Sequence, residues 1–89
     1  MNIYNGHDAE LVERINDVCN DAKQRNGLIL IVRSLCKLYA SETREKIGFV
    51  PHEDEDIMNN LSDFLMNVCD DEDLRIIIDF TRLALFNQI

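Results

Sequence analysis

Apolar residues recur at helical spacing along four segments of this chain, and only short breaks separate these segments. In the first segment, for example, Leu11, Ile15 and Val18 return at intervals of three or four residues, as the buried face of an amphipathic helix requires. The pattern restricts the chain to an all-α fold, and we expect a small four-helix bundle. Its helices should cover approximately residues 8–24, 28–47, 54–69 and 71–87.

Glycine and proline mark the expected breaks. Asn26-Gly27 interrupts the pattern between the first two segments, and Gly48 is a natural C-cap for the second, with Pro51 three residues beyond it. The aliphatic run at residues 28–32 is also compatible with a β-strand after an Asn-Gly turn. No second alternating segment offers this strand a partner, and the run continues downstream at helical period, which favours a helix.

Length and cysteine usage limit the architecture and the compartment. With 89 residues and 46% hydrophobic content, the chain can build one modest core, so we expect a single helical domain over residues 1–89. Cys19, Cys36 and Cys69 are odd in number and lie in apolar patterns, which excludes a fully disulfide-paired fold and indicates a reducing compartment. Neither a signal peptide nor a membrane-spanning run is recognisable, so we expect a soluble, cytoplasmic protein.

Two clusters of four consecutive carboxylates stand at residues 53–56 and 70–73, just before the third and fourth segments. Carboxylates at these positions accept bonds from free backbone N–H groups and stabilise the positive end of the helix dipole. Asp70 is a good N-cap with Asp73 at the third helical position, and Glu53 or Asp54 could cap the third helix. We therefore interpret both clusters primarily as the N-terminal ends of helices.

Metal binding is a weaker interpretation of the first cluster. An EF-hand loop alternates acidic residues and needs a glycine at its sharp turn, but no glycine follows Gly48. His52 and Asp56, four residues apart, form a helical ligand pair, yet a histidine beside acidic residues is more often a solvated surface group. We expect no metal and no cofactor.

An all-helical, metal-dependent nucleotide hydrolase is the enzyme class that deserves a test. Such bundles carry carboxylates three or four residues apart, as Glu10, Glu13 and Asp17 do, but their metal ligands project into the core. Here the carboxylates fall on the helix face nearly opposite the apolar stripe, so they should be solvated. No nucleophile motif or phosphate-binding glycine loop is present either, and we expect no enzymatic activity.

Charge is unevenly distributed along the chain. Residues 23–46 carry six Lys or Arg and two acidic residues, whereas the flanking regions are strongly acidic and the whole chain has a net charge of −8. Arg33, Lys37 and Arg44 could contact nucleic acid, but the acidic neighbours make pairing within the bundle the better interpretation. The net charge also argues against nucleic-acid and membrane binding and favours a protein partner with a basic surface.

The fourth segment has more apolar surface than one bundle stripe needs. Leu74, Ile77, Ile78, Ala84 and Leu85 form one stripe. Ile76, Phe80 and Leu83 form a second stripe beside it, and the second segment is similarly broad. Either this helix is central and wrapped by the other three, or the second stripe binds a partner. We favour a partner-binding stripe, which also makes a homodimer an expected state.

These observations indicate protein–protein binding. We expect a small acidic protein that acts as a non-catalytic inhibitor, an immunity- or antitoxin-like protein or a regulator, with a structural or regulatory homodimer as the alternative. The apolar contacts would come from the second stripe of the fourth segment. A set of carboxylates would steer a basic partner electrostatically: Asp54, Glu55, Asp71 and Glu72.

Overall fold

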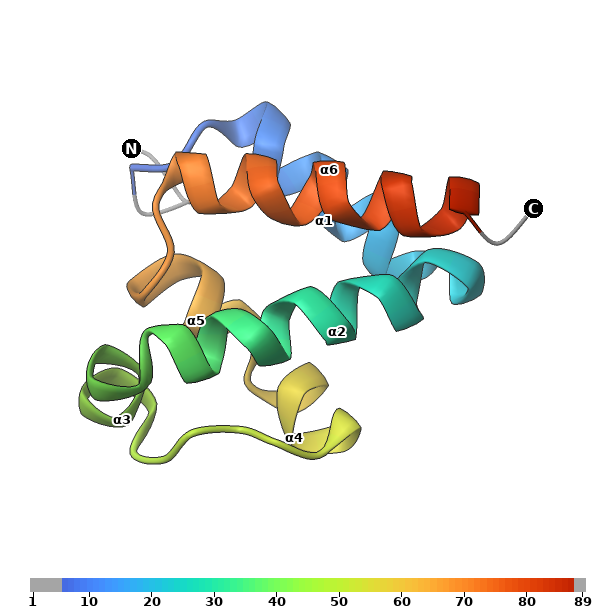
Figure 1. The fold of residues 1–89 in the computed structure, drawn as a ribbon. Helices are drawn as coiled ribbons and strands as arrows, with labels where there is room; N and C mark the ends of the chain where they lie inside the picture. Colours follow the sequence, from blue (N-terminus) through green and yellow to red (C-terminus); the bar gives the residue numbers. More distant parts are fainter. Residues whose placement is uncertain (1–5, 88–89) are drawn as a thin grey trace.

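The computed structural model describes residues 6–87 of the chain, with side-chain environments for residues 6–83. Within that range the chain is helical throughout its regular structure and forms no strand, so the predicted all-α class is confirmed. The helices are α1 (Ala9–Asn20), α2 (Ala22–Leu38), α3 (Ala40–Ile47), α4 (Asp54–Asn59), α5 (Leu61–Asn67) and α6 (Asp71–Asn87). Figure 1 shows their arrangement.

The boundary between α1 and α2 lies at Asp21, so the predicted break at Asn26-Gly27 is wrong. Asp21 has an extended backbone (φ −100°, ψ 114°), and its carboxylate accepts the backbone N–H of Lys23 at 2.9 Å and the side-chain amide of Gln24 at 2.8 Å. A carboxylate at an N-cap stabilises a helix by about 1 kcal/mol, similar to the cost of an interior glycine. Gly27 is buried inside α2.

Two of the predicted helices are each divided, which replaces the expected four helices with six in the described residues. The predicted helix at 28–47 breaks at Tyr39, whose backbone (φ −102°, ψ 38°) separates α2 from α3. The predicted helix at 54–69 breaks at Asn60, whose side-chain amide donates to the carbonyl of Asp56 at 2.8 Å and so competes with the helical ladder. The predicted stop at Gly48 is confirmed by its left-handed φ of 101°.

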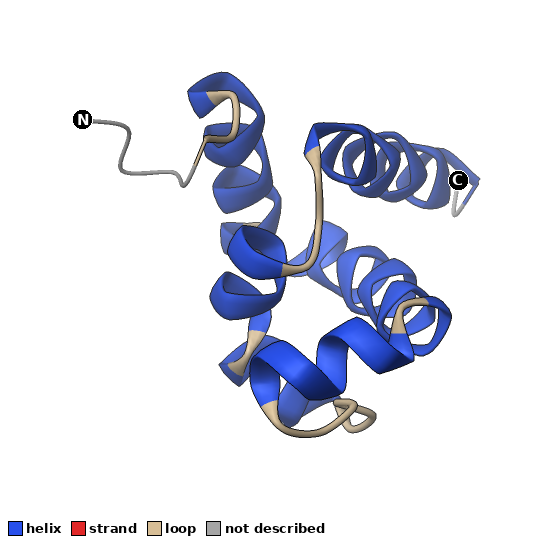
Figure 2. Cartoon of the chain, turned by 90° about the vertical axis from the view of Figure 1, so that its left-hand side faces the viewer, coloured by secondary structure: helices blue, strands red, loops and turns tan. Residues whose placement is uncertain are grey.

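The helices form a flat molecule with extents of 39 × 32 × 19 Å. α2 and α6 lie side by side and antiparallel, while α1 crosses behind them (Figures 1 and 2). The short helices α3 and α4 pack at the other edge of α2, and α5 packs against α3 and α4 (Figure 1). Because the shortest extent equals about two helix diameters, none of the helices in residues 6–87 can be surrounded on all sides.

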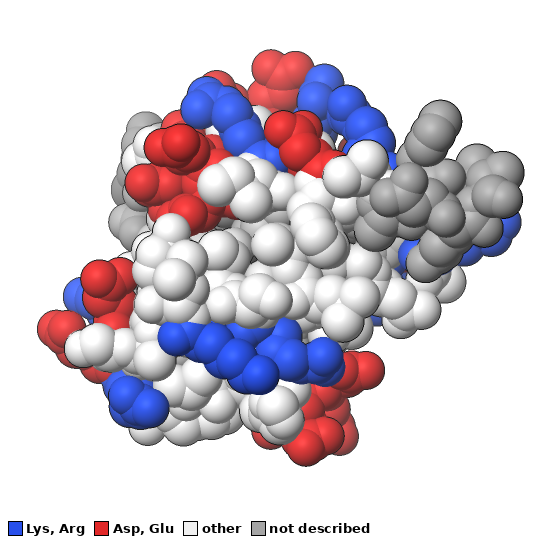
Figure 3. Space-filling model, in the orientation of Figure 1, with Lys and Arg blue, Asp and Glu red and all other residues white. Residues whose placement is uncertain are grey.

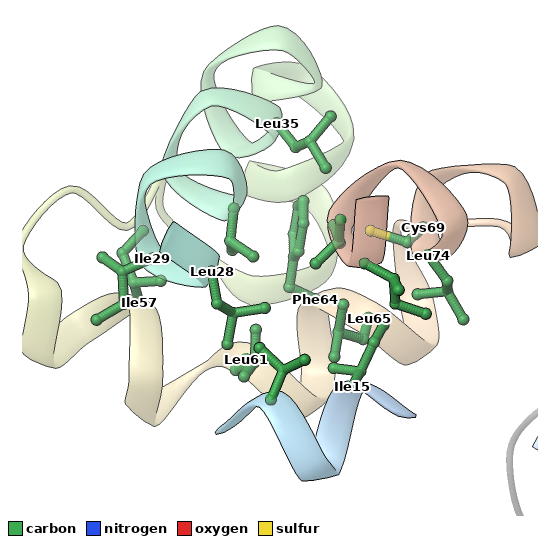
Figure 4. Packing of buried hydrophobic residues seen from close by; sticks show 14 of the residues in the cluster. Ile15, Leu28, Ile29, Leu35, Ile57, Leu61, Phe64, Leu65, Cys69 and Leu74 are labelled. Atoms are coloured by element: carbon green, nitrogen blue, oxygen red, sulfur yellow. The ribbon is translucent and has the colours of Figure 1, made fainter. Parts of the chain in front are cut away.

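The core lies between α1, α2, α5 and α6. Phe64 of α5 is 1% exposed and lies near the centre, among aliphatic side chains from neighbouring helices (Figure 4). Its fully buried companions are Ile15, Leu28, Val32, Ile57, Leu74 and Ile77. These residues occupy the inward face of each amphipathic helix, as the helical periodicity predicts.

Two carboxylates fix the start of α6, as predicted for Asp70 and Asp73. The backbone N–H of Asp73 donates to Oδ1 of Asp70 at 2.9 Å, and the backbone N–H of Asp70 donates to Oδ2 of Asp73 at 3.1 Å. This reciprocal arrangement has the geometry of a capping box. Asp73 is buried and also accepts the hydroxyl of Tyr39 at 2.7 Å. The C-terminal end of α2 is thereby tied to the N-terminal end of α6.

Candidate protein interface

The second apolar stripe of α6 faces outward. Ile76, Phe80 and Leu83 are 43%, 40% and 57% exposed, whereas Leu74, Ile77 and Ile78 of the first stripe are buried. At about 100° per residue, the three exposed side chains fall within about 60° of one another on the helix. The alternative of a central helix wrapped on all sides is therefore wrong for the described part of α6. The side chains of Ala84 and Leu85, also assigned to the first stripe, lie outside the described residues.

A matching apolar stripe lies on α2, which sequence reasoning recognised only as a broad apolar arc. Leu30 and Leu38 are 53% and 71% exposed, and Ile31 is partly buried between them and the core. Ser34 lies between Leu30 and Leu38 on the same side of the helix and is exposed. The signal in the sequence was the excess of leucine and isoleucine beyond the single buried stripe.

The two stripes lie on one face of the molecule. α2 and α6 are antiparallel neighbours, so the outward sectors that flank their shared contact point to the same side. Figure 3 shows an uncharged band over α6 and α2, with charged side chains along its edges, and Figure 2 shows α1 on the opposite side of this helix pair. We name this surface the α2–α6 face, made of Leu30, Ile31, Ser34, Leu38, Ile76, Phe80 and Leu83.

The two edges of the α2–α6 face differ in charge. On α6, the exposed Glu72 and Asp79 lie within about 40° of Leu83, while the two arginines of α6 lie farther round. On α2, the exposed Lys23 and Lys37 flank Leu30 within about 20° on either side. The α6 edge therefore carries two carboxylates beside the face and two arginines beyond them, whereas the α2 edge carries lysines.

A small hollow adjoins the α2 edge of this face. It has a volume of about 210 Å³ and is lined by Asn26, Ile29, Leu30, Arg33 and Asp54. Arg33 and Asp54 form an ion pair there, and the Nε of Arg33 also donates to the backbone carbonyl of His52 at 2.9 Å. The charged groups of the hollow, Arg33 and Asp54, therefore have partners within the chain, and they join α4 to α2.

The carboxylates predicted to steer a partner fall into two kinds. Asp54 is bound by Arg33, and Asp71 accepts from the side chain of His7 at 2.8 Å. Glu55 and Glu72 are exposed, with no hydrogen bond or ion pair from their side chains within residues 6–87. The structure thus gives Asp54 and Asp71 partners within the chain, although Asp54 stays exposed, and it leaves Glu55 and Glu72 available at the surface.

The contact between His7 and Asp71 was not anticipated from the sequence. His7 is 8% exposed, and Asp71 also accepts the backbone N–H of Asp8 at 3.3 Å. The hydrogen bond from His7, and then that from Asp8, hold the pKa of Asp71 below its ordinary value. Asp71 therefore fastens the segment before α1 to the start of α6.

Groups that could carry enzyme chemistry are scattered in the described structure. Glu10, Glu13 and Asp17 are exposed on α1, as predicted, and His52 is exposed in the loop before α4. Within residues 6–87 no three His, Cys, Asp or Glu side chains gather as a metal site would require.

The three cysteines are free, and Cys36 and Cys69 are buried. Burial raises the pKa of Cys36 to about 11. Burial, followed by the charge of Asp73, also raises the pKa of Cys69. Cys19 is partly exposed, and its pKa is raised by burial as well. These thiols are held in their less reactive, protonated form.

The helices of the described region are all too short or too polar to cross a bilayer. Comparison with protein families, curated proteins and solved structures found no match to this chain.

Proposed function

We propose that this protein acts in the cytoplasm by binding another protein chain through the α2–α6 face, without catalysis. One observation carries the proposal: five large apolar side chains, each 40–71% exposed, lie on two adjacent helices. Monomeric proteins rarely expose a contiguous apolar patch of this kind unless it is a binding surface. The non-catalytic classes that fit are an inhibitor, an immunity- or antitoxin-like protein or a regulator.

The composition of the face supports this proposal. Phe80 lies in the middle of the α6 stripe, and aromatic side chains at the centre of an interface commonly contribute most of its binding energy. Charged side chains border the face and leave its centre apolar (Figure 3). An apolar centre with a polar rim is the usual composition of a protein interface.

The absence of catalysis is part of the proposal and has its own test. The outward direction of Glu10, Glu13 and Asp17 and the raised pKa values of the cysteines support it. Hydrolysis of nucleoside triphosphates that depends on Mg²⁺ and is lost in Glu13→Gln would instead show that the least favoured class, a metal-dependent nucleotide hydrolase, is correct. We expect no turnover above that of a denatured sample.

Two matched phenylalanine variants test the binding surface. Phe80 is 40% exposed on the α2–α6 face, and Phe49 is 43% exposed in the loop between α3 and α4. Immobilised wild-type protein and F49Q should capture the same proteins from a native lysate, whereas F80Q should lose them, because only F80Q places an amide in the centre of the face. Equal capture by all three proteins would contradict a binding role for the face.

The exposed acidic side chains outside the apolar centre of the face would steer a basic partner toward the protein. Glu55 and Glu72 stand at the starts of α4 and α6 and form no internal ion pair in the described structure. Such charges raise association rates more than final affinities. Changing both to glutamine should slow association of a captured basic partner and flatten its salt dependence, as measured by stopped flow. An unchanged rate at low salt would assign these residues to helix stabilisation alone.

A further inference from the structure

We propose that the occupant of the α2–α6 face is a second copy of this chain, in a two-fold dimer in which α6 of each copy stacks on α2 of the other. The proposal rests on the protein-binding role inferred above for this face. It adds the identity of the partner and the orientation in which the partner binds. The charges along the two edges of the face determine that orientation.

Two symmetric stackings would bring the face onto itself. In one, the two-fold axis lies in the interface perpendicular to the helices, so α2 stacks on α2 and α6 on α6. The α2 edge with Lys37 would then meet the lysines of the other α2 edge, and Glu72 and Asp79 of the other copy would lie away from them. Like charges placed opposite each other at an interface are strongly unfavourable.

In the other stacking, the two-fold axis runs parallel to the helices. Each α6 then covers the α2 of the other copy, and Lys37 at the edge of each α2 lies on the same side as Glu72 and Asp79 of the other α6. Because α2 and α6 are antiparallel within the chain, α6 of the second copy is also antiparallel to the α2 that it covers. The interface becomes a four-helix layer with antiparallel neighbours, which is a common helix packing.

The register of the contacts follows from the bond between Tyr39 and Asp73. This hydrogen bond of 2.7 Å places the end of α2 level with the start of α6. A two-fold axis parallel to the helices does not change the position of a residue along the helix direction. Lys37 therefore lies opposite the turn that contains Arg75 of the second copy. At 1.5 Å per residue, Glu72 of that copy is about 4.5 Å to one side and Asp79 about 6 Å to the other.

The size of the face indicates an interface of moderate strength. α2 and α6 have 17 residues each, so together they cover a footprint of about 25 Å by 20 Å. Two copies would therefore bury on the order of 1,000 Å², near the lower limit for a specific interface. We expect a dissociation constant in the micromolar range, since such interfaces depend on their central apolar contacts.

Charge reversal tests the arrangement. Sedimentation equilibrium of the full chain at physiological salt should show a monomer–dimer equilibrium. K37E should weaken dimerisation by about tenfold or more, because it opposes Glu72 and Asp79 with a like charge on both sides of the axis. Adding E72K and D79K to K37E restores opposite charges and should recover the wild-type dissociation constant within about threefold.

Arg14→Glu on α1 is the matched control, because it changes the net charge by the same amount on the side away from the face (Figure 2). It should leave dimerisation within about twofold of wild type. Equal weakening by R14E and K37E would overturn the proposed orientation, as would a K37E variant that dimerises like wild type. Far-UV circular dichroism of each variant confirms that the helices are retained.

Different results would contradict the proposed dimer and the wider proposal of a protein-binding role. A wild-type chain that stays monomeric at several hundred micromolar overturns the dimer. If F80Q still loses a captured protein in that case while F49Q retains it, the face binds a different chain and the proposed function stands. If neither dimerisation nor capture depends on Phe80, both proposals are wrong.

Discussion

Removing one hydroxyl group should measurably weaken the junction between α2 and α6. Tyr39→Phe deletes the donor of the 2.7 Å hydrogen bond to Asp73 and leaves the ring in place. A hydrogen bond to a charged group contributes about 1.5–3 kcal/mol. Tyr39 is partly exposed, so we expect a loss of about 1.5–2 kcal/mol, the lower part of that range. For a chain of this length, total stability is only about 4–13 kcal/mol.

The same bond predicts an alkaline pH dependence. The hydrogen bond to Asp73, followed by burial, raises the pKa of Tyr39 to about 12. Its folded pKa thus lies above the value of about 10 for a free tyrosine, so the folded state favours the neutral phenol. The contribution of the bond is complete below about pH 10 and is lost as the pH rises toward 12.

Urea unfolding followed by circular dichroism at 222 nm measures both effects. Wild type and Tyr39→Phe should differ at pH 7 and converge as the pH rises above 10. Ser41→Ala, an exposed neighbour on α3, should stay within about 0.5 kcal/mol of wild type. A loss smaller than about 0.5 kcal/mol for Tyr39→Phe at pH 7, or a difference that persists unchanged at alkaline pH, would refute the reasoning.

Three further outcomes are expected. Asp71→Asn should lower the free energy of unfolding at neutral pH, whereas Glu72→Gln should change it by less than about 0.5 kcal/mol. The pKa of Asp71 is lower in the folded state than its ordinary value of 3.8. The stabilisation by Asp71 is therefore present above pH 3.8 and is lost as the pH falls through the folded pKa. Urea titrations at several pH values would measure this loss. Cys36 and Cys69 should react with a thiol reagent only after unfolding, with Cys19 ahead of both; complete labelling of the native protein within minutes would contradict the packing. Dimerisation should strengthen from low to physiological salt, because salt screens the repulsion between two chains of net charge −8. A dissociation constant that rises with salt would show that this repulsion does not dominate.

The features that the sequence predicted correctly are those with local causes. Asp70 and Asp73 are three residues apart, so their capping bonds depend only on the first turn of α6. The outward direction of Ile76 and Phe80 follows from helical periodicity once Ile77 and Ile78 occupy the core. In each case the spacing along one helix contains the required information.

The features that the sequence did not predict depend on partners far along the chain or on competing local bonds. Tyr39 and Asp73 are 34 residues apart, and His7 and Asp71 are 64 apart, so no window of helical pattern relates them. At Asp21 a side-chain cap outweighed the breaking tendency of the Asn-Gly pair. The position of helix breaks was therefore the weakest part of the sequence interpretation.

The outward position of the α6 stripe also affects how this chain can evolve. Phe80 and Leu83 contribute little to the core, so substitutions there should leave folding nearly unchanged and act mainly on recognition. Leu74, Ile77 and Ile78, on the other side of the same helix, are buried and must be conserved in size and polarity for the chain to fold. Mutational drift on a single helix can thus exchange one partner for another while the architecture that presents the helix stays constant.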